Sequence, residues 1–237
     1  MKCVVICPKG SGRWPVVYLL HGWTGKYSNW IMKVPAIVEY AQENKIMIVC
    51  PDGDVASWYF DSPIDSSSKY ETYISKEVPA YIDAHYKTVA DRNARAITGL
   101  SMGGHGALFI AFRHADIFGA CGSMSGGVDL NSSKGKFGIS QFIGDTINYA
   151  SNWNNFSVIH QVETPPSESL AILFDCGLSD FFFPSNRALH EKMLRLKIPH
   201  DYTERPGNHD WNYWANSVQY HLIFFKNFFR GKNGKRK

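Results

Sequence analysis

The chain has 237 residues, of which 44% are hydrophobic and 19% are charged, and its formal net charge is +4. This length and apolar content favour a single α/β domain over residues 1–237 and exclude a largely disordered chain. Much of the modest positive charge lies in residues 231–237, where we expect a flexible basic tail, so we expect no nucleic-acid partner. Since no apolar run is long enough to cross a bilayer, we also expect no membrane partner.

Seven strand-like runs alternate with helical patterns along the chain. Strands are expected at 2–7, 15–20, 45–50, 94–98, 119–124, 169–175 and 200–204, and helices at 31–43, 71–85, 102–113, 184–196 and 211–229. Most of the strand runs are apolar on both faces, as in parallel strands covered by helices on both sides. The alternation predicts a doubly wound, mostly parallel sheet with its active site at the carboxyl ends of the strands.

Residues 126–166 interrupt this rhythm. They are rich in Ser, Asn and Gly and contain a short helical candidate over 140–149. A long irregular segment within an α/β domain is typical of a functional insertion. We therefore expect a small lid-like insertion over the site.

The five cysteines are odd in number, and four of them lie in or at the ends of apolar strand runs. Buried free thiols are therefore expected. A Cys3–Cys7 disulfide is the alternative, although two residues so far apart in one extended strand are poorly placed to pair. No metal-ligand spacing is present, and we expect neither a metal nor another cofactor.

The stretch Gly-Leu-Ser-Met-Gly-Gly-His-Gly-Ala at 99–107 joins a strand-like run to a helical one. Its Gly-x-Ser-x-Gly pattern predicts a nucleophile elbow, a tight turn that holds Ser101 clear of the sheet at the N-terminus of a helix. Glycines at positions 99 and 103 would keep side chains from colliding in that turn. The alternative is a Gly/Ser turn that matches a short pattern by chance.

A second glycine-rich loop, His-Gly-Trp-Thr-Gly at 21–25, follows an early strand. In an esterase, such a loop lends one backbone N–H to an oxyanion hole, and the residue after the serine lends another. We expect the N–H groups of Trp23 and Met102 to serve, with Thr24 as the alternative in the first loop. We expect His21 to brace this loop, because it precedes the elbow in the chain.

The serine needs a base and an orienting acid, which follow it in the chain order Ser, acid, His. His209 lies in a loop after the last strand run and before the last helix, where that base belongs. Asp180 lies in the loop beyond the strand run at 169–175. Asp175 is the main alternative and is expected to bond loop backbone instead. The weaker alternatives are Asp201 and Asp210.

Aromatic residues cluster after the third strand run, at 51–62, and elsewhere near the expected sheet edge. Trp58, Tyr59, Trp153 and Trp211, with Trp23, are expected to form walls that stack on a sugar or on an aromatic acyl group. The alternative for each is ordinary packing beneath a loop.

The chain resembles the putative esterase (esterase D-like) family of α/β-hydrolases, and within it the bacterial feruloyl and acetylxylan carbohydrate esterases. The matching stretches are 16–25 (VVYLLHGWTG), 51–62, 71–83, 97–107 (ITGLSMGGHGA), 175–182 (DCGLSDFF) and 206–214 (PGNHDWNYW). The resemblance implies an α/β-hydrolase fold with Ser101, Asp180 and His209 as the catalytic triad and oxyanion donors near Trp23 and Met102. Relatives carry one or two more strands before the position of Lys2, so we expect an exposed edge strand and a missing N-terminal segment.

We therefore expect a serine ester hydrolase that acts through an acyl-enzyme on a small ester or an acylated oligosaccharide, with feruloyl or acetyl groups of plant cell-wall polysaccharide as the acyl groups. A thioesterase of the formylglutathione hydrolase type, with a tighter pocket and fewer aromatic walls, is one alternative. A sugar-accepting transferase and a catalytically inactive carbohydrate-binding relative are the others. The resemblance favours a secreted or periplasmic location, whereas the N-terminal apolar run is too short for a signal peptide and leaves a cytoplasmic one open.

Overall fold

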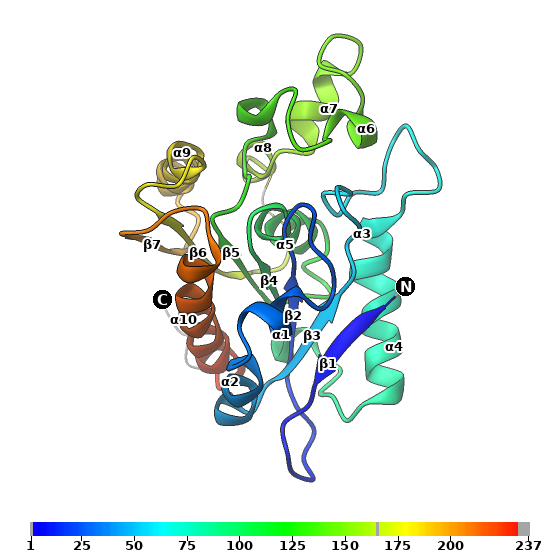
Figure 1. Ribbon diagram of the computed structural model, residues 1–237, viewed down its shortest axis with the longest axis vertical. Helices are drawn as coiled ribbons and strands as arrows, with labels where there is room; N and C mark the ends of the chain where they lie inside the picture. Colours follow the sequence, from blue (N-terminus) through cyan, green and yellow to red (C-terminus); the bar gives the residue numbers. More distant parts are fainter. Residues whose placement is uncertain (1, 165, 232–237) are drawn as a thin grey trace.

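The computed structural model describes residues 2–164 and 166–231, and a seven-stranded sheet lies at its centre (Figure 1). The strand order is β1-β3-β2-β4-β5-β6-β7. The strands are β1 (Cys3–Ile6), β2 (Val16–Leu20), β3 (Met47–Pro51), β4 (Arg95–Gly99), β5 (Ala120–Met124), β6 (Ala171–Gly177) and β7 (Asp201–Arg205). Only the β1–β3 pair is antiparallel among the paired strands of the described chain. The predicted mostly parallel sheet is confirmed, and each predicted run overlaps one strand.

The strand order reverses beside β2. The chain adds β3 on one side of β2 and then returns to add β4 on the other. Loops that leave the carboxyl ends of two such strands diverge and open a crevice, which is where ligands bind in open α/β sheets. The two glycine-rich loops of the sequence follow β2 and β4, so both lie at this crevice.

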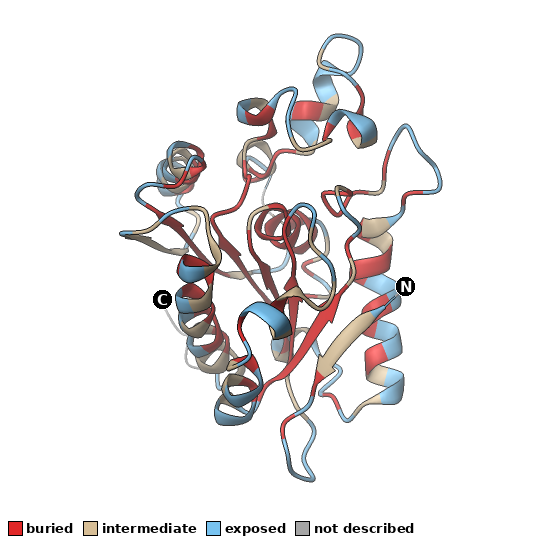
Figure 2. Ribbon diagram, in the orientation of Figure 1, coloured by how far each residue is buried: buried red, intermediate tan, exposed pale blue. Residues whose placement is uncertain are grey.

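Alternate residues of the central strand β2 pack against different sets of helices, one set on each face of the sheet. Val17 and Leu19 pack in one apolar cluster with α1 (Asn29–Lys33), α2 (Ile37–Asn44) and α10 (Trp211–Phe229). Tyr18 and Leu20 pack in the other with the π-helix η1 (Tyr73–Glu77), α4 (Val78–His85), α5 (Met102–Arg113) and α9 (Phe183–Arg195). Figure 2 shows the inner strands buried, whereas β1 and β7 at the two edges are mostly half-buried. Helices therefore cover both faces, as the two-sided apolar runs predicted.

Two predicted helices are interrupted at prolines. The helix expected over 31–43 is divided into α1 and α2, with Pro35 in the break. Proline lacks an N–H and clashes with the preceding turn, so a helix does not continue smoothly through it. The helix expected over 71–85 comprises α3 (Tyr70–Thr72), η1 and α4, and its wide π turn immediately precedes the turn that contains Pro79. A short 3-10 helix, η2 (Arg92–Ala94), immediately precedes β4.

The described part of the segment 126–166 contains the 3-10 helix η3 (Leu130–Ser133) and three short α-helices, α6 (Ser140–Ile143), α7 (Ala150–Asn155) and α8 (Val158–Gln161). Figure 1 shows them at the top of the view, beyond α5. The segment is joined to the body by hydrogen bonds as well as apolar packing: the Ser62 hydroxyl donates to the Phe142 carbonyl at 2.6 Å, and the Asn186 amide donates to the Gly126 carbonyl at 2.9 Å. The helical candidate over 140–149 holds for its first turn alone.

All five cysteines are free. Cys50, Cys121 and Cys176 are buried, as expected, but Cys3 is half-buried and Cys7 is exposed because β1 lies at the edge of the sheet. Across residues 2–164 and 166–231, no helix is both long and apolar enough to span a membrane, and no group of three or more potential ligands is arranged for a metal ion. Except for Gly231, the predicted basic tail lies outside the described residues.

Candidate active site

Ser101 lies between β4 and α5, in a backbone conformation that few residues other than glycine adopt. Its φ is 54° and its ψ is −117°. Its N–H donates to the Met124 carbonyl at the end of β5 at 2.9 Å, which ties the turn to the neighbouring strand. Such strain persists where surrounding contacts hold it, and it is common at functional sites. The strand–serine–helix turn expected from the sequence is therefore present.

Glycine is required on both sides of this serine because backbone segments approach closely there. A Cβ on Gly103 would lie 2.5 Å from the His21 carbonyl oxygen, and a Cβ on Gly99 would lie 2.6 Å from the carbonyl carbon of Gly103. Both distances are far inside van der Waals contact. The glycines thus allow α5 to begin directly against the loop that follows β2.

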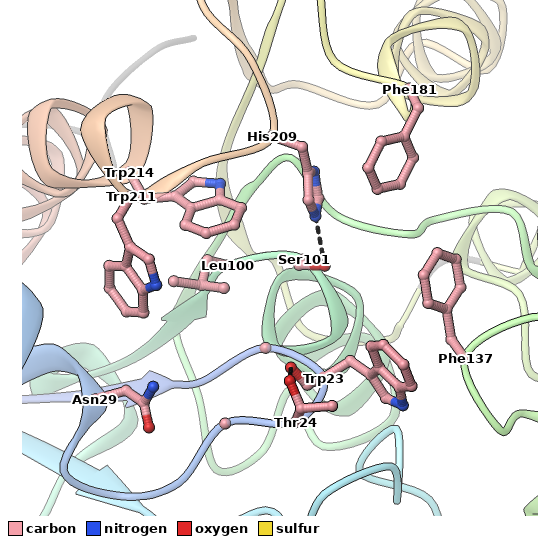
Figure 3. Close-up of a pocket in the computed structure, with 12 residues that line it drawn as sticks. Trp23, Thr24, Asn29, Leu100, Ser101, Phe137, Phe181, His209, Trp211 and Trp214 are labelled. Atoms are coloured by element: carbon pink, nitrogen blue, oxygen red, sulfur yellow. Dashed lines mark hydrogen bonds between the residues drawn. The ribbon is translucent and has the colours of Figure 1, made fainter.

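His209 and Asp180 complete a chain of hydrogen bonds that starts at the serine. The distance from Ser101 Oγ to His209 Nε2 is 2.9 Å, and from His209 Nδ1 to Asp180 Oδ2 it is 2.7 Å (Figure 3). The other carboxylate oxygen of Asp180 accepts the Phe182 N–H at 2.8 Å, and the Asp180 side chain is buried. A hydroxyl, an imidazole and a carboxylate are therefore aligned in the order that a nucleophile, a base and an orienting acid require. The carboxylate favours the imidazole tautomer with its proton at Nδ1, which leaves the lone pair of Nε2 facing the hydroxyl.

The loops that carry the acid and the histidine are joined to one another. The Leu178 N–H donates to the Arg205 carbonyl and the Ser179 N–H donates to the Gly207 carbonyl, each at 2.9 Å. These bonds extend the pairing of β6 with β7 beyond the ends of the strands. A Cβ on Gly177 would lie 2.5 Å from the Gly207 oxygen, so this approach also requires glycine.

Within the described residues the Asp175 carboxylate bonds side chains and not loop backbone, so that prediction is wrong. It is buried on β6 and accepts hydrogen bonds from the side chains of Ser217 and His221 on α10, and it pairs with Arg205 on β7 at 3.1 Å. Burial by itself would raise the pKa of Asp175, but the His221 hydrogen bond and the Arg205 charge outweigh it and hold the pKa below its usual range. Asp175 therefore joins β6, β7 and α10 beneath the acid and histidine loops.

The weaker alternatives for the acid lie elsewhere. Asp201 is the first residue of β7, at the end of the strand away from the site. Asp210 caps α10, and its carboxylate accepts the Tyr213 N–H at 3.0 Å.

The two backbone N–H groups expected to form an oxyanion hole are those of Trp23 and Met102. In the part of the chain that the structure describes, neither Trp23 N–H nor Met102 N–H donates a hydrogen bond. The Thr24 N–H instead donates to the Val55 carbonyl at 2.8 Å, which makes it unavailable. His21 braces this loop as expected: its Nε2 accepts the Gly53 N–H at 2.8 Å, and its Nδ1 donates to the Gly22 carbonyl at 2.9 Å.

A cavity of about 250 Å³ opens above Ser101, and Figure 3 shows the side chains around it. Its aromatic walls are Trp23, Phe137, Phe181, Trp211 and Trp214, and its other lining residues are Gly22, Thr24, Gly25, Asn29, Leu100, Ser101 and His209. Apart from His209, no acidic or basic side chain of the described residues lines it. The cavity therefore suits an uncharged, largely apolar group.

Three aromatic residues expected in these walls are instead buried. The Trp58 N–H donates to the Phe137 carbonyl at 3.1 Å, the Tyr59 hydroxyl donates to the His21 carbonyl at 2.9 Å, and the Trp153 N–H donates to the Gly144 carbonyl at 3.0 Å. Each indole or phenol is thus satisfied by backbone, so ordinary packing is the correct interpretation for all three. Trp211 does line the cavity, as predicted.

Sequence reasoning missed three of the walls. Phe181 directly follows Asp180, and Trp214 lies one turn into the helix after His209, so nearness to the acid and the histidine was a usable signal for both. Phe137 lies in the irregular insertion and carries no comparable signal.

A model of the family described as "Putative esterase" matches residues 1–225. Among curated relatives, Esterase Rv1288 of Mycobacterium tuberculosis is 26% identical over 84% of this chain and 49% of its own length, so the chain spans about half of that relative. S-formylglutathione hydrolase of Bos taurus is 26% identical over 94% of this chain and 88% of its own. The mycolyltransferase Ag85A of Mycobacterium leprae is 34% identical over 88% of this chain and 74% of its own.

Solved structures share the whole architecture. A ferulic acid esterase superposes with a TM-score of 0.79 at 28% identity, covering 94% of this chain and 91% of its own. The serine hydrolase FphF of Staphylococcus aureus superposes with a TM-score of 0.81 at 22% identity over the same shares. The predicted α/β-hydrolase fold is confirmed.

Proposed function

This chain belongs to the putative esterase family, and from that premise we propose that Ser101, His209 and Asp180 hydrolyse carboxylic esters through an acyl-enzyme. Family membership supports the ester hydrolase class predicted from the sequence. The roles of the individual residues and the choice of substrate are our proposal. The observation that carries it is the 2.9 Å hydrogen bond between Ser101 Oγ and His209 Nε2 at the floor of the aromatic cavity.

In the first half-reaction, the Ser101 hydroxyl attacks the ester carbonyl carbon while His209 Nε2 takes its proton. The negative charge that develops on the carbonyl oxygen accepts hydrogen bonds from the N–H groups of Trp23 and Met102. Losing one such donor typically costs about 100- to 1000-fold in rate. Asp180 stabilises the imidazolium through the Nδ1–H bond, and His209 then gives its proton to the leaving alcohol.

In the second half-reaction, a water molecule takes the place of the alcohol. His209 removes a proton from this water as it attacks the acyl-enzyme, and the same N–H groups stabilise the new oxyanion. Collapse of that intermediate returns the proton to Ser101 and releases the acid. The chain's own side chains supply every proton transfer.

For the acyl group, we propose a feruloyl or acetyl group esterified to plant cell-wall polysaccharide. Five aromatic walls and an uncharged cavity favour an aromatic acyl group such as feruloyl, and aromatic rings gain from stacking or edge contacts with such a group. The ferulic acid esterase among the structural neighbours supports this choice. The walls argue against the thioesterase alternative, which we expected to have fewer aromatic residues. The complete hydrogen-bonded set argues against an inactive carbohydrate-binding protein.

A substrate panel tests the proposal. Purified protein is given methyl ferulate, methyl acetate, acetylated xylan and S-formylglutathione, with and without added xylo-oligosaccharide as acceptor. We expect hydrolysis of methyl ferulate with the highest kcat/KM, and its loss in Ser101→Ala together with loss of labelling by a fluorophosphonate. Preference for the thioester, or undiminished turnover by Ser101→Ala, would reject the proposal.

A further inference from the structure

Phe137 brings the insertion into the active site. It lines the cavity although every other lining residue comes from the loops and helices of the main fold. Its ring lies nearly parallel to that of Phe181, with centroids 6.2 Å apart and an interplanar angle of 17°, and edge-on to Trp23 at 5.5 Å. These three rings form one continuous aromatic surface beside Ser101.

The backbone that presents Phe137 is unusual. Gly135, Phe137 and Gly138 all have positive φ, at 74°, 55° and 70°. Lys134, Gly135 and Lys136 are exposed, and a Cβ on Gly135 would meet nothing within 4 Å. A left-handed conformation is unfavourable for phenylalanine and persists where neighbouring contacts impose it. The loop 134–138 is therefore held from the Phe137 side.

Trp58 provides the contacts that fix Phe137 in this conformation. Its indole N–H donates to the Phe137 carbonyl at 3.1 Å, and the two rings are 6.3 Å apart. Trp58 is 1% exposed and lies edge-on to His105 at 5.4 Å, and a Cβ on Gly127 would lie 2.9 Å from its ring. His105 is on α5, one turn after Ser101. A packed chain of side chains thus runs from the helix of the nucleophile to the insertion.

The two ends of the cavity differ in chemistry. Figure 3 shows Trp211, Trp214 and Asn29 on one side of Ser101, and Phe137 and Phe181 on the other. At the first end, the Asn29 side-chain oxygen accepts the Lys26 N–H at 2.7 Å, while its amide nitrogen donates no hydrogen bond within residues 2–164 and 166–231. That end suits hydroxyl groups. The first end therefore combines two indole rings with an amide donor, whereas at the other end Phe137 and Phe181 offer only aromatic rings and suit a planar ring.

We propose that the loop 134–138 is the acyl-specificity element of this site: Phe137 binds the aromatic ring of a hydroxycinnamoyl group, and Trp58 is the positioning residue that holds Phe137 in place. The inference rests on the proposed ester hydrolysis and names the part of the cavity that each half of the substrate occupies. Trp58 acts on the substrate through Phe137 and does not touch it.

Kinetic selectivity tests the positioning role. Trp58→Phe keeps a buried ring and removes the donor to the Phe137 carbonyl. We expect the ratio of kcat/KM for methyl ferulate to that for methyl acetate to fall about tenfold in Trp58→Phe and at least as far in Phe137→Ala, mainly through KM for methyl ferulate. The matched control is Ile147→Ala, in the same insertion but 86% exposed, which should leave the ratio unchanged. Equal loss on both esters would overturn the inference.

Binding tests the acyl site without catalysis. Isothermal titration compares ferulate binding to Ser101→Ala and to Ser101→Ala/Phe137→Ala, with circular dichroism to confirm folding. We expect the Kd of ferulate to rise about tenfold on loss of the ring. If the wild type hydrolyses no ester while Phe137→Ala still weakens ferulate binding, the proposed function fails and the acyl site stands. Absent ferulate binding, or binding that Phe137→Ala leaves unchanged, overturns the inference whatever the hydrolysis result.

Discussion

Replacing Asp180 with asparagine should leave the protein folded and remove most of its activity. One carboxylate oxygen of Asp180 accepts the Phe182 N–H at 2.8 Å, and the asparagine carbonyl can keep that bond. The asparagine NH₂ then occupies the position 2.7 Å from His209 Nδ1. Because an NH₂ group donates, Nδ1 must accept, and the imidazole proton moves to Nε2, facing Ser101.

A histidine in that tautomer cannot take the serine proton. The corresponding change in serine proteases costs about 10⁴-fold in kcat, and at about 1.4 kcal/mol for each factor of ten this is about 5.5 kcal/mol of transition-state stabilisation. The assay is steady-state hydrolysis of p-nitrophenyl acetate, with thermal unfolding as the folding check. Asp210→Asn is the matched control, because asparagine caps a helix as well as aspartate does and should leave kcat within about twofold. A kcat for Asp180→Asn within tenfold of the wild type would refute the reasoning.

Two further changes test the packing around the nucleophile. Gly103→Ala places a methyl group 2.5 Å from the His21 carbonyl oxygen and should lower the free energy of unfolding by about 1–3 kcal/mol in urea titrations. The control is Gly12→Ala, whose Cβ would meet nothing closer than 3.7 Å and which should change the free energy of unfolding little. Equal effects of the two substitutions would contradict this account. Burial of His105 lowers its pKa from 6.5 to about 3, so the unfolded chain binds a proton below about pH 6.5 that the folded chain does not. The contribution of neutral His105 to the free energy of unfolding is therefore fully present above about pH 6.5. As the pH drops toward 3, that contribution falls by up to about 1.4 kcal/mol per pH unit. Between about pH 3 and 6.5, the free energy of unfolding of His105→Gln should therefore fall less steeply with decreasing pH than that of the wild type, by up to this amount per pH unit. Equal slopes in urea titrations at several pH values would contradict the contribution assigned to His105.

The sheet could be predicted from sequence because its signal is local. Strands buried on both faces are apolar without alternation, so most of the runs predicted a parallel strand, and all seven lie within about two residues of an observed strand's ends. The run at 2–7 forms β1, which pairs antiparallel at the edge of the sheet. The helical runs were less complete. The apolar period continues across 31–43, but Pro35 lacks the N–H that a continuous helix would need.

Some residues of the site could be predicted from local sequence signals, and others could not. Ser101, His209 and Asp180 follow from a short motif and from chain order, since each directly follows a strand. The places of Trp58 and Tyr59 depend instead on backbone conformation: both have positive φ, at 52° and 63°, which turns the loop so that their side chains enter the core. Positive φ in an aromatic residue has no sequence signature. Phe137, with φ of 55°, escaped notice for the same reason.

The main-chain bonds from Leu178 to Arg205 and from Ser179 to Gly207 bear on how the hydrogen-bonded site responds to thermal motion. These bonds join the loops that carry the Asp180 carboxylate and the His209 imidazole, whereas the Ser101 hydroxyl lies between β4 and α5. We expect a small displacement of Ser101 relative to these two loops to lengthen its contact with His209 first and to leave the imidazole oriented by Asp180. The Ser101–His209 hydrogen bond can then form again when the two groups move back together, without rotation of the imidazole ring or a change of its tautomer.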